Sequence, residues 1–186
     1  MRIIGGRFKG RTLASVGKGD AGAHLRPTTD RIRESLFNVL QGGALGDPIT
    51  DAHVLDLFAG TGALGFEALS RGALHVNFVD DGRKAQSLIA ENIRLTDSES
   101  HTTLLRRDAT RLPANTGLQA TLVFLDPPYG AGLGTKALIA ASQNNWLAKG
   151  ALIVFEDNAP APPLTDFERL DERRYGDTHI TFLEVP

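Results

Sequence analysis

Apolar residues gather along the chain in short runs, which are separated by longer stretches with helical spacing. After Pro48 the short runs predict strands at 53–58, 75–80, 102–107, 120–126 and 151–156. The stretches between them predict helices at 62–71, 82–96 and 134–146. Apolar strands that alternate with helices are typical of a buried, mostly parallel sheet with helices on both faces. The pattern therefore predicts an α/β fold with a doubly wound sheet.

The N-terminal part of the chain departs from this alternation. Residues 2–14 predict a short β-hairpin, and 15–25 form a loop rich in glycine and alanine. A helix should follow Pro27 and end before Gly42, and its N-cap is one of Thr28, Thr29 and Asp30. Its apolar face comprises Ile32, Leu36, Val39 and Leu40.

The C-terminal part contains two strand-like runs around residues 175–177, which predict an antiparallel hairpin that closes the sheet. We accordingly divide the chain into a basic hairpin and loop at 1–25 and an α/β body at 26–186.

Composition narrows the class of protein. The 186 residues correspond to one ordinary domain. The absence of cysteine excludes disulfides, thiolate nucleophiles and cysteine-ligated metals, and the five histidines lack metal-ligand spacing. The N-terminal apolar run is too short for a signal peptide, and no run reaches the ~20 residues of a membrane span. We therefore expect a soluble, cytoplasmic and monomeric protein without a metal ion.

The net charge of −2 is unevenly distributed along the chain. Residues 1–41 carry eight Arg and Lys side chains against three acids, a net charge of +5. The remaining residues carry twelve against nineteen, a net charge of −7. A basic segment on an acidic body is often associated with polyanion binding, although an unevenly charged solvated surface explains it equally well.

The stretch DLFAGTGALGFE contains Gly60, Gly62 and Gly65 in G-x-G-x-x-G spacing. Such a loop after a strand indicates a nucleotide site, because ligands of open α/β sheets bind at the carboxyl ends of the strands. The carboxylate of Asp56 makes a pyrophosphate an unfavourable ligand here. It suits the α-ammonium of S-adenosylmethionine, with the glycines allowing backbone approach to the cofactor, or it is a structural cap of the loop. No G-K-[ST] follows, which excludes a P-loop.

Three further carboxylates follow the next two predicted strands. Asp80 lies 20 residues after Gly60 and suits the ribose hydroxyls of either kind of cofactor. Asp81 is a further cofactor-binding candidate, with a helix N-cap as its alternative role. Asp108 suits an adenine amino group or a helix cap, and the sequence does not distinguish between them.

The strand predicted at 120–126 leads into Asp126-Pro127-Pro128-Tyr129-Gly130, which is also ordinary turn material. Two successive prolines fix φ and remove two N–H donors, so the Asp126 carboxylate and the Pro127 carbonyl form an acceptor pair without a competing backbone donor. Such a pair suits a planar exocyclic amino group with two hydrogens. Tyr129 offers a face for base stacking, typically worth ~1–3 kcal/mol per base. A glycine loop combined with D-P-P-Y resembles the amino-methyltransferases of nucleic-acid bases.

Five segments narrow this resemblance to the RsmD family: RIIGGRFKGRTL, LRPTTDRIRESLFNVL, DLFAGTGALGFEALSRGA, DPPYG and RRYGDTHITFLE. The family methylates guanine N2 in small-subunit (16S) ribosomal RNA. The resemblance covers nearly the whole chain and implies a Rossmann-like class I S-adenosylmethionine-dependent methyltransferase that acts on the assembling small subunit. Two departures are the longer loop at 15–25 and Asp80, which stands where many members have Glu and has a shorter reach.

The resemblance and the motifs together assign residues to roles. The catalytic candidates are Asp126, Pro127, Pro128 and Tyr129. The cofactor-binding candidates are Asp56, Phe58, Ala59, Gly60, Thr61, Gly62, Asp80, Asp81, Asp108 and Ala109. The candidate RNA contacts are Arg2, Arg7, Lys9, Arg11, Arg26, Arg31 and Arg33, some of which can instead pair with acids of the body. Arg33 and Thr28 can alternatively border the methionine carboxylate.

Three conspicuous side chains fit structural roles. Glu67 suits an early turn of a helix, where a carboxylate is favourable. Trp146 suits packing at the end of a helix, and Glu156 either faces the cleft or makes a structural hydrogen bond.

Other functions stay open at this point. A DNA adenine-N6 or cytosine-N4 methyltransferase uses the same acceptor pair, although 186 residues leave no room for a target-recognition domain. An NAD(P)-dependent oxidoreductase is disfavoured by Asp56 and D-P-P-Y. A non-catalytic RNA-binding assembly factor on the same fold is the third alternative.

Overall fold

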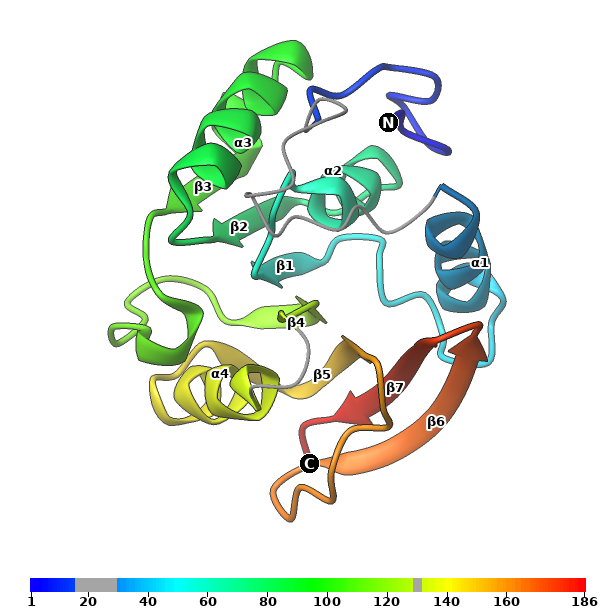
Figure 1. Cartoon of the computed structure of the whole chain (residues 1–186), viewed down its shortest axis with the longest axis vertical. Helices are drawn as coiled ribbons and strands as arrows, with labels where there is room; N and C mark the ends of the chain where they lie inside the picture. The colour runs from blue at the N-terminus through cyan, green and yellow to red at the C-terminus, as the bar shows by residue number, and fades with distance from the viewer. Residues whose placement is uncertain (16–29, 129–131) are drawn as a thin grey trace.

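The computed structural model describes residues 1–15, 30–128 and 132–186. Its centre is a sheet with the strand order β3-β2-β1-β4-β5-β7-β6 (Figure 1). Strands β1 to β5 run parallel, and β7 pairs antiparallel with β5 and β6. The bounds are β1 His53–Leu57, β2 His75–Val79, β3 Thr102–Leu105, β4 Ala120–Leu125, β5 Leu147–Asp157, β6 Glu168–Tyr175 and β7 Thr178–Glu184. This confirms the predicted doubly wound sheet that a C-terminal hairpin closes.

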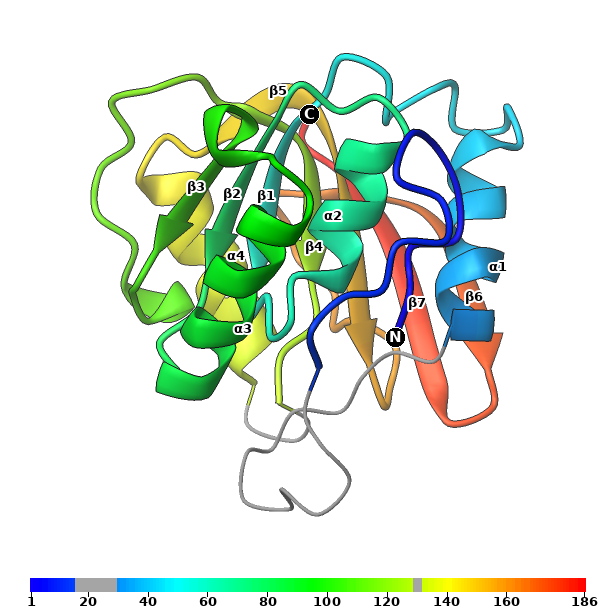
Figure 2. The same ribbon diagram turned by 90° about the horizontal axis from the view of Figure 1, so that it is seen from above.

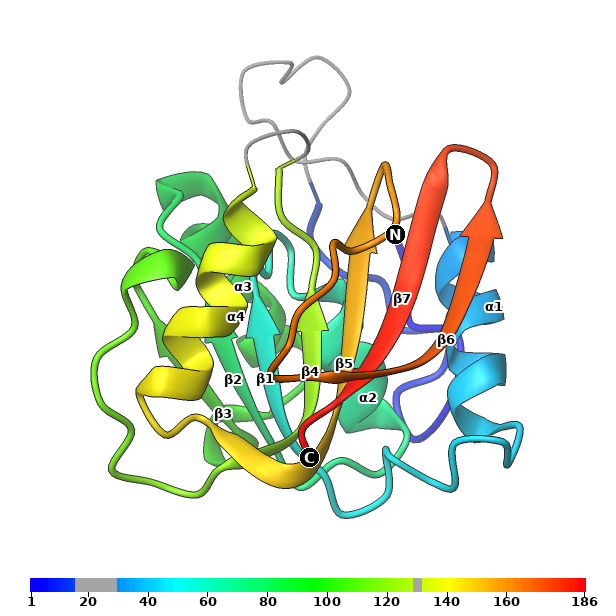
Figure 3. The ribbon, with the colours of Figure 1, turned by 90° about the horizontal axis from the view of Figure 1, so that it is seen from below.

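The helices cover both faces of the sheet. They are α1 Asp30–Gln41, α2 Ala63–Ser70, α3 Arg83–Leu95 and α4 Leu133–Gln143, with 3-10 turns η2 Glu99–His101 and η3 Ala109–Arg111. Figure 2 shows the face that α1, α2 and α3 cover, and Figure 3 shows the face that α4 covers. One hydrophobic core lies under each layer. Among the described residues, no helix combines the length and apolarity needed to cross a bilayer.

The predicted element bounds differ from the structure mainly at three places. Strand β3 ends at Leu105, β5 already begins at Leu147, and α4 ends at Gln143. Trp146, which lies shortly after this helix end, is buried as predicted. Its indole N–H donates to the Pro113 carbonyl at 2.8 Å.

Helix α1 buries a different stripe from the predicted one. Leu36 and Leu40 are buried as expected, whereas Ile32 and Val39 are only half-buried. Phe37 and Arg33 take the remaining core positions, with 0% and 1% of their surface exposed. The helix ends at Gln41, before Gly42, as predicted. The predicted N-caps Thr28 and Thr29 lie outside the described residues.

The N-terminal arm, residues 1–15, forms an irregular hairpin against α2. An isolated antiparallel bridge joins Arg2 and Thr12, and the Ile3 N–H donates to the Arg11 carbonyl at 3.0 Å. Ile3 is buried in the core under α2. The arm therefore reverses its direction as predicted. Contacts with the body, rather than a regular two-stranded ladder, hold it in place.

Candidate cofactor and substrate site

The glycine loop joins β1 to α2 at the carboxyl edge of the sheet. Phe58, Gly60 and Gly62 have φ values of 58°, 58° and 78°, all in the left-handed region. The Ala59 N–H donates across to β2 at 3.1 Å, and the Gly62 N–H donates to the Ala59 carbonyl at 2.7 Å. A left-handed phenylalanine costs ~1–2 kcal/mol, and such strain concentrates at functional sites. The half-exposed part of the loop, 58–60, is the part that a ligand can reach.

The second and third glycines are tightly packed, and their approach to a ligand stays a prediction. A Cβ at Gly62 would lie 2.7 Å from the Phe66 ring. A Cβ at Gly65 would lie 2.7 Å from Val76 and 2.9 Å from the Asp56 carboxylate. Both glycines therefore let α2 lie close to the sheet. Thr61 is buried, and its contribution to a cofactor site stays a prediction.

Asp56 lies beneath the loop with 2% of its surface exposed. Its Oδ2 accepts the Gly65 N–H at 3.0 Å, which is the structural capping role that the sequence left open. Burial raises the pKa of Asp56 to about 8, against the hydrogen bond from Gly65 and with a smaller contribution from the charge of Asp80. A positive ligand group nearby would favour the ionised form again.

Asp80 joins the glycine loop to the turn after β2. Its Oδ2 accepts the Gly60 N–H at 2.9 Å, and its Oδ1 accepts the Gly82 N–H at 2.8 Å. Burial raises the pKa of this half-buried carboxyl. Asp81 is exposed, and its alternative role as N-cap is wrong, because α3 has Gly82 as its N-cap without a side-chain bond.

Asp108 caps η3, which confirms the structural alternative for this residue. It accepts the Thr110 N–H at 2.8 Å and the Thr110 hydroxyl at 2.7 Å, and these bonds hold the pKa of the Asp108 carboxyl below its ordinary value. Ala109, the neighbouring candidate, is buried. A contact of either residue with an adenine stays a prediction.

The D-P-P turn begins directly beside the glycine loop. Strand β4 pairs with β1, Leu57 faces Leu125, and the Asp126 N–H lies 3.5 Å from the Leu57 carbonyl. Asp126 is half-buried, Pro127 is buried and Pro128 is exposed. A Cβ at Gly134 would lie 3.0 Å from the Pro127 ring, so this ring packs on the first turn of α4. The fourth candidate, Tyr129, lies outside the described residues.

The predicted RNA-binding cations fall into three groups. Arg2, Arg7, Lys9 and Arg31 are exposed. Arg11 is exposed as well, but it donates to the Leu95 carbonyl and lies 3.8 Å from the Asp97 carboxylate. The prediction that Arg33 contacts RNA is wrong. Its side chain is 1% exposed and bonded to the Arg2 carbonyl, so it cannot reach a phosphate at the surface. Arg26 lies outside the described residues.

Glu67 has a role that the sequence did not indicate. Its carboxylate is fully buried and accepts the Ile4 and Gly5 N–H groups at 2.8 Å each. The Arg71 Nε donates to the same carboxylate at 2.8 Å, and the Arg33 Nε lies 3.7 Å away. Glu67 thus ties the N-terminal arm, α1 and α2 together. A charged residue predicted within an apolar helix, GFEALS, was the signal that could have suggested a buried ion pair.

A doubly wound sheet of this order, with a glycine loop after β1 and a D-P-P turn after the neighbouring β4, defines a Rossmann-like methyltransferase. A family model described as "Conserved hypothetical protein 95" matches residues 1–184. The chain belongs to this family, the RsmD family that its segments resemble.

Named relatives and solved structures agree with this assignment. Ribosomal RNA small subunit methyltransferase D of Escherichia coli K12 is 38% identical over 156 residues, which cover 84% of this chain and 74% of that protein. The putative rRNA methyltransferase YlbH of Bacillus subtilis is 42% identical over 161 residues, covering 84% and 82%. The structure of the putative methyltransferase yhhF from Escherichia coli has a TM-score of 0.82 and 34% identity, and the match covers 100% of this chain and 97% of that one.

Proposed function

We propose that this chain transfers a methyl group from S-adenosylmethionine to the exocyclic N2 amino group of a guanine in small-subunit (16S) ribosomal RNA. The pairing of β1 with β4, which sets the Asp126 backbone beside the glycine loop, carries the proposal. It brings a candidate cofactor loop and a candidate amine acceptor pair to one edge of the sheet. The names of the relatives support the ribosomal substrate.

The residues at this edge fit S-adenosylmethionine. The backbone of 58–60 is half-exposed, and no phosphate-binding lysine follows it. The Asp80 carboxylate is held by two N–H groups and keeps lone pairs for ribose hydroxyls. The α-ammonium of the methionine end would favour the ionised form of Asp56, whose pKa burial raises to about 8. Asp81, Asp108 and Ala109 complete the predicted adenosine side. The cofactor supplies an electrophilic methyl group when it is bound.

The acceptor pair addresses the chemical difficulty of the reaction. The lone pair of guanine N2 is conjugated with the ring, so the amine is a poor nucleophile. The Asp126 carboxylate and the Pro127 carbonyl accept its two hydrogens and align nitrogen with the methyl group. They also stabilise the positive charge that develops on nitrogen during transfer. Alignment of this kind can supply ~7–11 kcal/mol of barrier lowering. Tyr129 is the predicted stacking partner of the base.

The RNA has to present the base outside its stack, because the N2 edge is otherwise hidden. The exposed cations Arg2, Arg7, Lys9 and Arg31 are the predicted phosphate contacts, together with Arg11 and Arg26. Each true phosphate contact adds about 0.7–0.9 to the salt slope of RNA binding.

The test combines a variant with a map of the modified nucleosides. Asp126→Asn should lower kcat by about 10²–10³-fold, the usual loss when one preorganised electrostatic partner is removed. Its affinity for S-adenosylhomocysteine, measured by calorimetry with NADH as the negative control, should stay unchanged. Near-normal turnover would overturn the role of Asp126.

Nucleoside mapping of ribosomal RNA from cells with and without the protein tests the substrate. Loss of one N2-methylguanosine is the expected result. An unchanged map together with a change in DNA methylation would favour the DNA methyltransferase, and unchanged maps of both would favour a non-catalytic assembly factor.

A further inference from the structure

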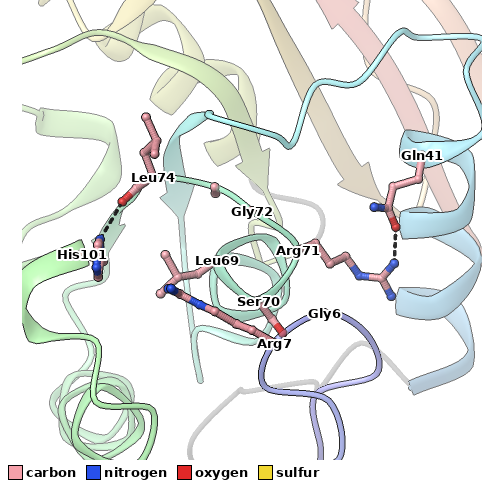
Figure 4. Close-up of a pocket in the computed structure, with 10 residues that line it drawn as sticks. Gly6, Arg7, Gln41, Leu69, Ser70, Arg71, Gly72, Leu74 and His101 are labelled. Atoms are coloured by element: carbon pink, nitrogen blue, oxygen red, sulfur yellow. Dashed lines mark hydrogen bonds between the residues drawn. The ribbon is translucent and has the colours of Figure 1, made fainter.

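A cavity of about 440 Å³ lies between the tip of the N-terminal arm and the C-terminal end of α2 (Figure 4). Its walls come from Gly6 and Arg7 of the arm, from residues 69–74, and from His101 in η2. Its volume falls in the range of small-ligand sites. The glycine loop precedes the opposite end of α2, so this cavity is separate from the candidate cofactor and substrate site.

Two arginines, Arg7 and Arg71, and the imidazole of His101 line the cavity, and among the described residues no carboxylate does. Within the described parts of the chain no acid pairs with Arg7, whose guanidinium lies 4.5 Å from the centre of the Phe8 ring. Figure 4 shows the Arg7 side chain extended across the cavity in the direction of His101. The Arg7 guanidinium is therefore placed over an aromatic face and available to an anion.

Arg71 fixes the opposite wall. Its Nε donates to Glu67 at 2.8 Å, and its Nη1 donates to the Gln41 side chain. The charge of Arg71 is thus shared with a buried carboxylate, which leaves Arg7 as the main cation for a ligand.

The imidazole of His101 has one nitrogen committed to the fold. Its Nδ1 lies 3.1 Å from the Leu74 carbonyl. A carbonyl oxygen only accepts, so Nδ1 carries a proton and Nε2 is the ring atom that remains for a ligand. The neutral ring offers Nε2 as an acceptor for a ribose hydroxyl, and the protonated ring offers it as a donor for a phosphate oxygen.

The arm holds Arg7 on a rigid platform. The Arg7 N–H donates to the Ser70 carbonyl at 2.7 Å, and the Phe8 N–H donates to the Ser70 hydroxyl at 2.9 Å. The Gly6 backbone packs so closely on the Ser70 carbonyl that a Cβ would lie less than 3.0 Å from it. Because the backbone of Arg7 is already fixed, only its side chain has to be ordered when an anion binds.

We propose that this cavity binds one backbone phosphate of the RNA strand that flanks the target base, with Arg7 as the main contact and His101 as the second. This inference rests on the proposed function. Helix α2 has 8 residues, so ~12 Å separate the cavity from the glycine loop.

The test measures binding of in vitro transcribed small-subunit ribosomal RNA over a series of salt concentrations. Arg7→Gln should lower the affinity and reduce the salt slope by about 0.7–0.9. The matched control is Arg174→Gln, which removes an exposed cation of β6 at the far edge of the sheet and should leave both quantities unchanged. Calorimetry with S-adenosylhomocysteine should give the same affinity for all variants, which shows that the fold is intact.

His101→Gln tests whether both residues meet at one phosphate. Residues that share a ligand are coupled, so the double variant should lose less affinity than the sum of the two single losses. RNA binding of Arg7→Gln equal to that of Arg174→Gln would overturn the proposal, and additive losses would overturn the shared contact.

Inorganic phosphate distinguishes a free anion from an RNA phosphate. If the imidazole resonances of His101 shift with inorganic phosphate while Arg7→Gln leaves RNA binding intact, the cavity is a small-anion site and the assignment to RNA is wrong. If the wild-type protein binds RNA through Arg7 but methylates none, the proposed function fails and the phosphate contact stands.

Discussion

The Gly6 backbone packs closely against the backbone of Ser70 and Arg71. Replacing Gly6 with alanine tests whether this close packing holds the N-terminal arm on α2. Gly6 has a φ of +74°, and an added Cβ would lie less than 3.0 Å from the Ser70 carbonyl and 2.8 Å from the Arg71 N–H nitrogen. Both are backbone atoms of α2, so they cannot rotate away. Gly10 is the matched control, because it has a φ of +83° and open space around its Cβ position.

The structure sets the size of the expected effect. Docking of the arm includes hydrogen bonds from Ile4 and Gly5 to Glu67 and from Phe8 to Ser70. At ~0.5–1.5 kcal/mol each, these three bonds contribute about 1.5–4.5 kcal/mol. Undocking also leaves the buried Glu67 carboxylate with fewer partners. Gly10→Ala costs only the left-handed strain of ~1–2 kcal/mol.

Urea unfolding of the two variants gives the difference directly. Gly6→Ala should be less stable than Gly10→Ala by ~1.5–4.5 kcal/mol, and amide exchange should show lost protection at residues 3–8. Equal free energies of unfolding with unchanged protection would refute the reasoning, since the arm would then bind α2 without this close approach.

Two further substitutions test the glycine loop. Gly65→Ala places a Cβ 2.7 Å from Val76, and such overpacking should cost ~1–3 kcal/mol in urea unfolding, whereas Gly117→Ala in an exposed loop should cost little; the same midpoint for both would contradict the packing role. Asp56→Asn tests the buried carboxyl. Because burial raises the pKa of Asp56 to about 8, the folded state keeps a proton that the unfolded chain releases near its ordinary pKa of 3.8. This group therefore stabilises the fold at low pH, and its contribution falls by at most ~1.4 kcal/mol per pH unit as the pH rises toward 8. The stability of the asparagine variant relative to wild type should grow across this range, and parallel profiles from urea unfolding would show that the pKa is not raised.

The fold class follows from local pattern alone. Short apolar runs with helical stretches between them are properties of neighbouring residues, and burial on both faces of a parallel sheet requires such runs. The sequence also predicted the cap at Asp108, as one of two alternatives, and the packing of Trp146, because caps and the ends of helices depend on a few residues nearby in the chain. The bounds of β5 did not follow, because its first residues extend the strand through pairing with β4 at Ala120.

The direction of individual side chains depended on the tertiary structure. Asp56 and Arg33 occur in motifs that predict ligand contacts, but packing of α2 and α1 turns both inward. The sequence places Glu67 in an apolar helix, but only the return of the arm, 62 and 63 residues away, gives it its backbone partners Ile4 and Gly5.

The sequence by itself determined the alternation of strands and helices and the position of the glycine turn, and it predicts the acceptor pair of the D-P-P motif, because each depends on the chemistry of adjacent residues. Only the tertiary structure decided that β4 lies next to β1 and that the N-terminal arm lies along α2. The physical reason is that local patterns leave several segments equally suitable as spatial neighbours. Hydrogen bonds and close packing between distant segments then select one arrangement.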